Sequence, residues 1–172
     1  MRKLDEYRAK AKKLGREGFL AQHGEPVFVP TNIITGSLRN ANPRDRNATI
    51  MHHDRSSMVN PLSSKRAMKI GTDTIRHNLR NGLIIGRESR CAVTIADYTI
   101  SKQHARWKPG RFPRPATLED MGSSNGTWIN GTRLEKNKPT TINSGDTIRF
   151  GRMVLEYLSA KEFYERLVTG KI

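Results

Sequence analysis

Residues 116–134, ATLEDMGSSNGTWINGTRL, alternate short apolar runs with turn residues. The dipeptide Asn130-Gly131 favours a tight hairpin, because both residue types tolerate a positive φ. Similar short runs extend from about Ala67 to Leu158, with breaks at intervals of about 8 to 12 residues. This pattern predicts an all-β domain folded as an antiparallel β-sandwich.

The sequence predicts about 11 short strands within this domain, which we place over residues 67–158. We expect them at residues 67–70, 74–79, 83–86, 92–95, 104–108, 116–119, 127–129, 133–134, 140–142, 147–150 and 152–158. Turn residues at Asn81-Gly82 and at Ser144-Gly145-Asp146 separate several of these runs.

The first 24 residues carry a helical pattern. Leu4, Tyr7, Ala11 and Leu14 recur at a spacing of three to four, with charged residues between them. Residues 1–24 are therefore expected to contain an amphipathic helix. Its apolar stripe is thin, so the helix needs the domain or a partner to lie on.

The last 14 residues, 159–172, predict a short C-terminal helix. Ser159 and Glu162 have the spacing of a capping box, in which each side chain bonds the backbone N–H of the other residue. Gly170 is a suitable end for the helix. Phe163 and Leu167 should dock on the sandwich or on the first helix, because so short a helix is unstable alone.

Residues 25–66 are rich in Asn, Ser, Arg and Pro and hold few large apolar residues. This composition predicts a linker or a long surface loop. Adjacent histidines at His52 and His53 raise the question of a metal site, but no cysteine or second histidine pair stands near them. We expect no metal ion and no other cofactor.

The chain of 172 residues has a net charge of +15, which attracts polyanions or phosphorylated partners over long range. A single cysteine, Cys91, excludes an internal disulfide and favours a reducing compartment. No run approaches the roughly 18 apolar residues that cross a bilayer. The sequence thus predicts a cytoplasmic protein without membrane insertion.

Four short motifs occur in one order along the β domain. They are Ile84-Ile85-Gly86-Arg87, Ser101-Lys102-Gln103-His104, residues 120–126 (DMGSSNG) and Trp128-Ile129-Asn130-Gly131, followed by residues 145–151 (GDTIRFG). Together they resemble the forkhead-associated (FHA) domain family over residues 67–158. The resemblance implies a β-sandwich that binds phosphothreonine in a partner protein and is not an enzyme.

The resemblance also implies which residues bind the phosphopeptide. They are Arg87, Ser101, Lys102, Ser124 and Asn125. A phosphothreonine carries about −1.5 to −2 charges and three acceptor oxygens, which a guanidinium and hydroxyl groups match. Lys102 stands where arginine or asparagine is common in the family. It keeps a positive charge but lacks the planar fork of arginine or the amide of asparagine.

A second group of residues is expected to support the site. It consists of Gly86, His104, Gly126, Asn130 and Gly131. Ser101 and His104 also suggest a nucleophile and a base, but the sequence offers no convincing third group or oxyanion site, so we expect no catalytic residues. Arg87 has an alternative too, a salt bridge to Glu88 or Asp97.

The predicted function is that of a phosphothreonine-dependent adaptor downstream of a Ser/Thr kinase, with the kinase or its substrate as partner. The alternative is an electrostatic nucleic-acid-binding protein on an FHA scaffold. Tyr98 and Thr99, with no obvious cation beside them, favour an apolar residue three positions after the phosphothreonine. Thr31 and Thr35 each have an apolar residue at that position, so a phosphorylated form of either is a candidate for self-docking.

Overall fold

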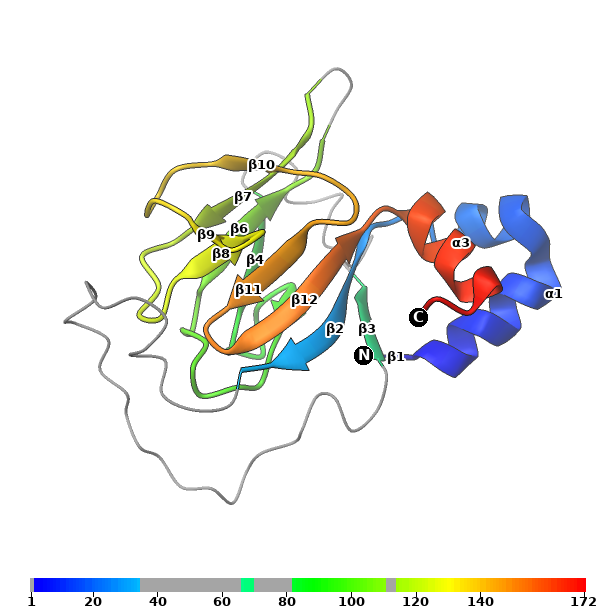
Figure 1. Ribbon diagram of the computed structural model, residues 1–172, viewed down its shortest axis with the longest axis horizontal. Helices are drawn as coiled ribbons and strands as arrows, with labels where there is room; N and C mark the ends of the chain where they lie inside the picture. Colours follow the sequence, from blue (N-terminus) through cyan, green and yellow to red (C-terminus); the bar gives the residue numbers. More distant parts are fainter. Residues whose placement is uncertain (1, 35–65, 70–81, 111–113) are drawn as a thin grey trace.

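In the computed structural model, residues 2–34, 66–69, 82–110 and 114–172 are described. Two β-sheets pack face to face, and two helices lie together at one end of the sandwich (Figure 1). The all-β sandwich with a helix at each flank, predicted from the sequence, is confirmed.

The larger sheet has seven strands among the described residues. In spatial order they are β1 (Arg2–Lys3), β3 (Arg66–Lys69), β2 (Val27–Ile33), β12 (Met153–Leu158), β11 (Thr147–Phe150), β8 (Thr127–Ile129) and β9 (Thr132–Arg133). All the ladders of this sheet are antiparallel.

The smaller sheet has five strands within the described residues. Their order is β10 (Thr140–Ile142), β7 (Ala116–Asp120), β6 (Ala105–Lys108), β4 (Leu83–Gly86) and β5 (Val93–Thr94). One pair departs from the antiparallel expectation, since β4 and β5 run parallel. Strand positions agree with those expected to within about two residues, and the strand expected at 74–79 lies outside the described residues.

The main core lies between the two sheets and follows from the alternation of each strand. Phe150 on β11 and Tyr157 on β12 face Trp107 on β6, and all three are buried. Because side chains of a strand point alternately to its two faces, the intervening residues Arg149 and Glu156 lie on the outer face of the larger sheet.

Residues 27–33, which we expected to belong to a linker or loop over residues 25–66, form strand β2. It lies inside the sheet between β12 and β3, and its first residues Val27, Phe28 and Val29 are buried. A run of β-branched and aromatic residues favours such a strand, and the polar composition of the following segment obscured it. Residues 35–65, with His52 and His53, lie outside the described residues.

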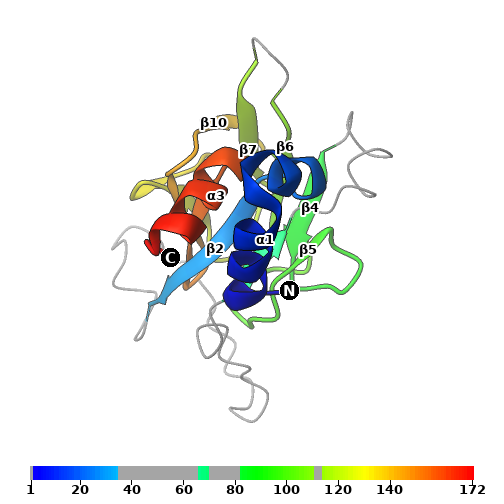
Figure 2. The ribbon, with the colours of Figure 1, turned by 90° about the vertical axis from the view of Figure 1, so that its right-hand side faces the viewer.

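Helices α1 (Leu4–Gln22) and α3 (Ala160–Thr169) form a second apolar cluster on the outer face of the larger sheet (Figure 2). Tyr7 and Phe19 of α1 and Phe163 of α3 pack there on Val27, Val29 and Leu158. The helices thus dock on the sandwich. Within the described residues, neither helix is long and apolar enough to span a membrane.

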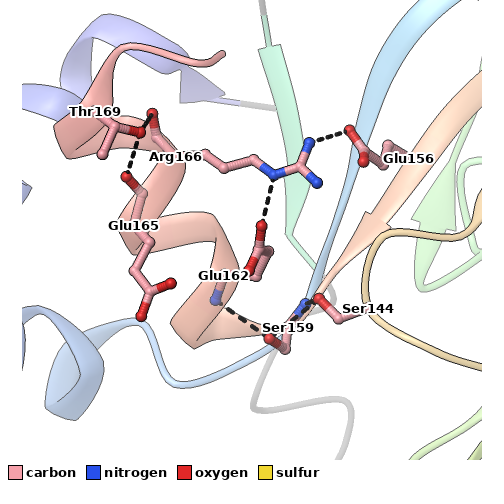
Figure 3. A network of polar contacts seen from close by, with 7 residues as sticks. All are labelled: Ser144, Glu156, Ser159, Glu162, Glu165, Arg166 and Thr169. Atoms are coloured by element: carbon pink, nitrogen blue, oxygen red, sulfur yellow. Dashed lines mark hydrogen bonds and ion pairs between the residues drawn. The ribbon is translucent and has the colours of Figure 1, made fainter.

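A polar network fixes the start of α3 (Figure 3). The Ser159 hydroxyl accepts from Glu162 N at 3.3 Å, as a capping box requires. The second bond of a capping box, from Ser159 N to the Glu162 carboxylate, is not formed. Ser159 N donates instead to the Ser144 hydroxyl at 2.9 Å. The Glu162 carboxylate instead accepts from Arg166 at 2.9 Å, and Arg166 also bonds Glu156 of β12 at 2.7 Å.

Phe163→Ala should lower the free energy of unfolding of the full chain by about 3 to 5 kcal/mol, because it leaves a cavity under both helices. The Phe163 ring is 1% exposed and lies 5.2 Å from the Tyr7 ring, centroid to centroid. Urea unfolding measures the change. Val168→Ala, at a residue 51% exposed on the same helix, is the control. Equal stability of the two variants would show that the helices do not contribute to the folded domain.

Candidate functional site

Three loops at one end of the sandwich bring the predicted phosphopeptide residues together. Arg87 follows β4, Ser101 lies before β6, and Ser124 and Asn125 lie between β7 and β8. Arg87 N donates to Ser101 O at 3.0 Å, and Ser124 N donates to the Ser101 hydroxyl at 3.2 Å. The Asn125 amide donates to Thr99 O at 2.8 Å. Ser101 therefore lies between the other two loops.

Arg87 is exposed, and it makes one side-chain hydrogen bond, from Nε to Ile100 O at 3.1 Å. The alternative of a salt bridge from Arg87 is wrong for both candidate acids. Glu88 pairs with Arg90 at 2.6 Å, and Asp97 pairs with Arg152 at 2.7 Å. Among the described residues, no carboxylate neutralises the Arg87 guanidinium, whose terminal N–H groups stay available.

Gly86 is required for the close packing of two loops. A Cβ at this position would lie 2.2 Å from Lys102 O and 3.0 Å from Cys91 Sγ. Lys102 O also accepts from Glu88 N at 3.3 Å. This contact holds the Arg87 loop against the Ser101 loop, while the Lys102 residue itself is exposed.

His104 lies buried beneath the loops and joins two of them. Its Nδ1 accepts from Ser101 N at 3.1 Å, so the proton is on Nε2, which donates to Gly126 O at 3.1 Å. Burial lowers the pKa of His104, while the bond to Gly126 and the charge of Asp120 act more weakly in the opposite direction. The ring contacts the backbone of Ser101 and makes no bond to its hydroxyl, so the two do not form a nucleophile–base pair.

Asp120 organises the loop between β7 and β8, a role that the sequence analysis missed. Its Oδ1 accepts from Gly122 N and Ser123 N, both at 2.9 Å, and its Oδ2 accepts from the hydroxyls of Ser123 and Thr127, both at 2.6 Å. Ser123 Oγ accepts in turn from Gly126 N at 3.0 Å. The order Asp120-Met121-Gly122-Ser123 could have predicted this role, because aspartate side chains often bond the backbone of such turns.

The ion pair of Asp97 and Arg152 also supports the loops, and we did not predict it from the sequence. Asp97 Oδ1 accepts from Thr99 N at 2.9 Å and from the Thr99 hydroxyl at 2.6 Å, while Arg152 N donates to that hydroxyl at 3.1 Å. The Arg152 guanidinium also lies 4.6 Å from the centre of the Tyr98 ring. A cation therefore stands beside Tyr98 and Thr99, contrary to our expectation, although Asp97 matches its charge.

Asn130 and Gly131 support the sheet and make no hydrogen bond to the three loops. Both adopt positive φ, 49° and 82°, as their hairpin requires. The Asn130 side chain bonds Asp146 at 2.8 Å and Thr147 N at 2.9 Å. Of the supporting residues expected, Gly86, His104 and Gly126 lie at the loops themselves.

No group of three or more potential metal ligands occurs in the described part of the chain. Cys91 is buried, and its thiol donates to Lys102 O at 3.2 Å. Burial raises the pKa of this thiol, so it stays protonated and serves packing.

Comparison with known proteins agrees with these motifs. The FHA domain family matches residues 83–151, which include Arg87, Ser101, Ser124 and Asn125. Residues 83–151 form an FHA domain. Two curated relatives are from Arabidopsis thaliana: the FHA domain-containing protein PS1, 29% identical over 69 residues, and a protein phosphatase 1 regulatory inhibitor subunit PPP1R8 homolog, 30% identical over 94 residues.

The matches cover 40% and 54% of this chain, and only 5% and 24% of the lengths of those relatives. Among solved structures, an FHA domain from a study of phosphothreonine-dependent FHA domain interactions is 25% identical, with a TM-score of 0.43. It covers 55% of this chain and 84% of its own. Mycobacterium tuberculosis EmbR, solved with a low-affinity phosphopeptide, is 20% identical with a TM-score of 0.45, covering 57% and 23%.

Because His104 is buried and neutral, the FHA domain should lose stability in acid. The pKa of His104 is lowered from its ordinary 6.5, so its contribution is complete above pH 6.5 and is lost as the pH falls toward the folded-state pKa. The free energy of unfolding should fall by up to about 1.4 kcal/mol for each pH unit in that window.

Chemical unfolding of the wild type and of His104→Gln across this pH range measures the effect, which appears as the difference between their slopes. NMR titration of the His104 ring gives an independent reading should the variant fold poorly. A ring that titrates near 6.5, or identical slopes for the two proteins, would contradict the prediction.

Proposed function

We propose that the FHA domain binds a phosphothreonine segment of a partner protein and acts as a non-catalytic adaptor downstream of a Ser/Thr kinase. The observation that carries the proposal is the exposed Arg87 residue beside Ser101, whose guanidinium has no carboxylate partner among the described residues. A dianionic phosphate placed there would receive charge-assisted hydrogen bonds from both residues.

The hydrogen-bond directions at Ser101 suit this role. Its oxygen already accepts from Ser124 N, so the hydroxyl hydrogen remains to donate to a phosphate oxygen. Lys102 is exposed on the next residue and would add positive charge without a planar fork. Arg87, Ser101 and Lys102 thus offer the donors that a phosphate group needs, and the two exposed cations supply the charge.

Asn125 would hold the main chain of the bound peptide. Its Nδ2 is engaged by Thr99 O, while its Oδ1 is buried and has no hydrogen-bond partner. A buried amide oxygen without a donor costs about 1 to 3 kcal/mol, which a peptide N–H from the ligand would recover. The loop held by Asp97 and Arg152 lies beside Asn125 and would contact the peptide beyond the phosphothreonine. We still predict an apolar residue three positions after the phosphothreonine.

Self-docking is less favoured for Thr31 than for Thr35. Thr31 lies in β2, where its hydroxyl donates to Val154 O at 3.2 Å and its neighbours pair with β12. Phosphopeptide binding would require this part of the strand to leave the sheet. Thr35 lies outside the described residues, and its self-docking remains a prediction, as does a cytoplasmic location.

Titration of the full chain with a phosphothreonine peptide library tests the proposal, beside phosphoserine and unphosphorylated versions. We expect micromolar binding that requires phosphothreonine. Arg87→Ala and Ser101→Ala should each weaken it at least tenfold, or about 1.4 kcal/mol. Arg90→Ala, which removes a nearby guanidinium paired with Glu88, is the matched control and should bind normally.

Binding that ignores both substitutions and the phosphate would contradict the proposal. A nucleic acid ligand, suggested by the net charge of +15, would be recognised by a second signature. Its affinity would fall linearly with the logarithm of salt concentration and would not depend on Ser101.

A further inference from the structure

Residues 2–22 and 66–69, here called the basic band, concentrate positive charge beside one edge of the larger sheet. They comprise β1, α1 and β3, of which β1 pairs with β3 and leads directly into α1. The basic band holds nine Lys or Arg residues and three Asp or Glu residues. Its net charge of +6 is a large share of the +15 of the whole chain.

The cations in the middle of α1 are not neutralised by neighbouring acids. Lys12 and Lys13 are exposed, Lys10 is half-buried, and none of the three has an ion pair or a hydrogen bond in the part of the chain that the structure describes. Arg16 reaches Glu165 of α3 only at 3.9 Å, and both side chains are about half exposed. An ion pair of this kind contributes little in water.

Among the described residues, the three acids of the basic band do not pair with these lysines. Two of them lie in the first turn of α1, where the helix dipole favours negative charge, and Asp5 pairs there with Arg8 at 2.9 Å. Glu17 stands four residues after Lys13, a spacing that joins side chains on a regular helix. Gly15 lies between them with a φ of 65° and a ψ of −176°, which interrupts the helix, and no ion pair forms.

The sheet edge adds cationic residues at paired positions. Lys3 of β1 is the register partner of Arg66 on β3, and β1 is the outermost strand of the larger sheet in the described residues. Arg2 and Lys69 extend the same two strands, which carry no acid. Like charges at directly opposite positions destabilise a strand pair, and an anion bound beside them relieves that repulsion.

The chemistry of α1 indicates which kind of anion fits. Its apolar side is already used, since Tyr7, Ala11 and Phe19 are buried against α3 and the larger sheet, so the helix has no apolar face to insert into a lipid surface. Its exposed side carries lysines and no aromatic residue, whereas the centres of protein interfaces are rich in aromatic residues and poor in lysine. Lysine binds phosphate as a point charge. A phosphate polymer suits this surface best.

We propose that the basic band binds the phosphate backbone of duplex nucleic acid and does not read the base sequence. The stretch from Lys3 to Arg16 extends for about 20 Å at the rise of an α-helix, the length of roughly six phosphates along one strand. Lysine and arginine side chains that contact phosphates release condensed counterions, which supplies the free energy of such binding.

The helices and the phosphopeptide loops lie at opposite ends of β12 (Figure 1). Arg152, just before this strand, pairs with Asp97 in the loop of Thr99, and Leu158, its last residue, packs beneath the helices. The six-residue strand separates these ends by about 20 Å. Neither site needs the other, and together they would bring a phosphorylated partner to nucleic acid.

Fluorescence anisotropy of a labelled DNA duplex of about 20 base pairs, titrated with the full chain over a range of salt concentrations, tests the proposal. We expect the logarithm of the association constant to fall linearly with that of the salt concentration, equally for two duplexes of unrelated sequence. A double variant, Lys12→Gln with Lys13→Gln, should weaken binding at low salt by about fivefold or more and make the slope shallower by about 2. Glu17→Gln should tighten binding, because it removes the unpaired acid beside these lysines.

The matched control is the double variant Lys136→Gln with Lys138→Gln, which removes the same charge from the exposed loop between β9 and β10 and should change binding much less. All four lysines are exposed, so both double variants should fold. Arg87→Ala should leave duplex binding unchanged, and the variant at Lys12 and Lys13 should still bind a phosphothreonine peptide, so the two sites are tested separately.

Three results would overturn the proposal. They are a duplex that does not bind or binds with a strong preference for one sequence, equal losses in the two double variants, and a dependence on Lys12 and Lys13 that appears only with other anions. The other anions are a glutamate-rich peptide and vesicles of phosphatidylserine and phosphatidylcholine, titrated in the same way.

Discussion

The buried, neutral ring of His104 is the constraint on which the recognition end of the FHA domain depends. It accepts from Ser101 N and donates to Gly126 O, so one side chain sets the distance between two loops that share no strand pairing. Loops of this kind have few apolar contacts of their own, and hydrogen bonds in a low-dielectric interior determine their shape. The ring in turn rests edge-on against Phe150, which connects the loops to the main core.

Two buried carboxylates complete this frame, and the way each is satisfied explains the charge of the site. Asp97 is neutralised by Arg152, whereas Asp120 is held by four uncharged donors. Both acids point inward, and neither pairs with Arg87. The negative charges of Asp97 and Asp120 therefore stabilise the loops from beneath. Arg87 and Lys102 are exposed and give the surface of the loops a positive charge. Within the described part of the chain, no carboxylate competes with an anionic ligand for Arg87.

Local patterns in the sequence predicted the strands, the Asn130-Gly131 hairpin, the two helices and the loops that carry Arg87 and Ser101. Features that depend on pairing between distant segments could not be predicted. Asp97 and Arg152 are 55 residues apart, and no pattern joins them before the sheets are assembled. Strand β2 was overlooked because three buried residues precede a polar stretch, and only pairing with β12 shows that they belong to the sandwich.

The terminal helices decide which part of the larger sheet can meet a partner. Without them, Val27, Val29 and Leu158 would expose an apolar surface at one end of the outer face, and that surface would dominate association. Among the described residues, the helices do not cover the other end of this face, which lies next to Gly126 and the loops that carry Arg87, Ser101 and Ser124.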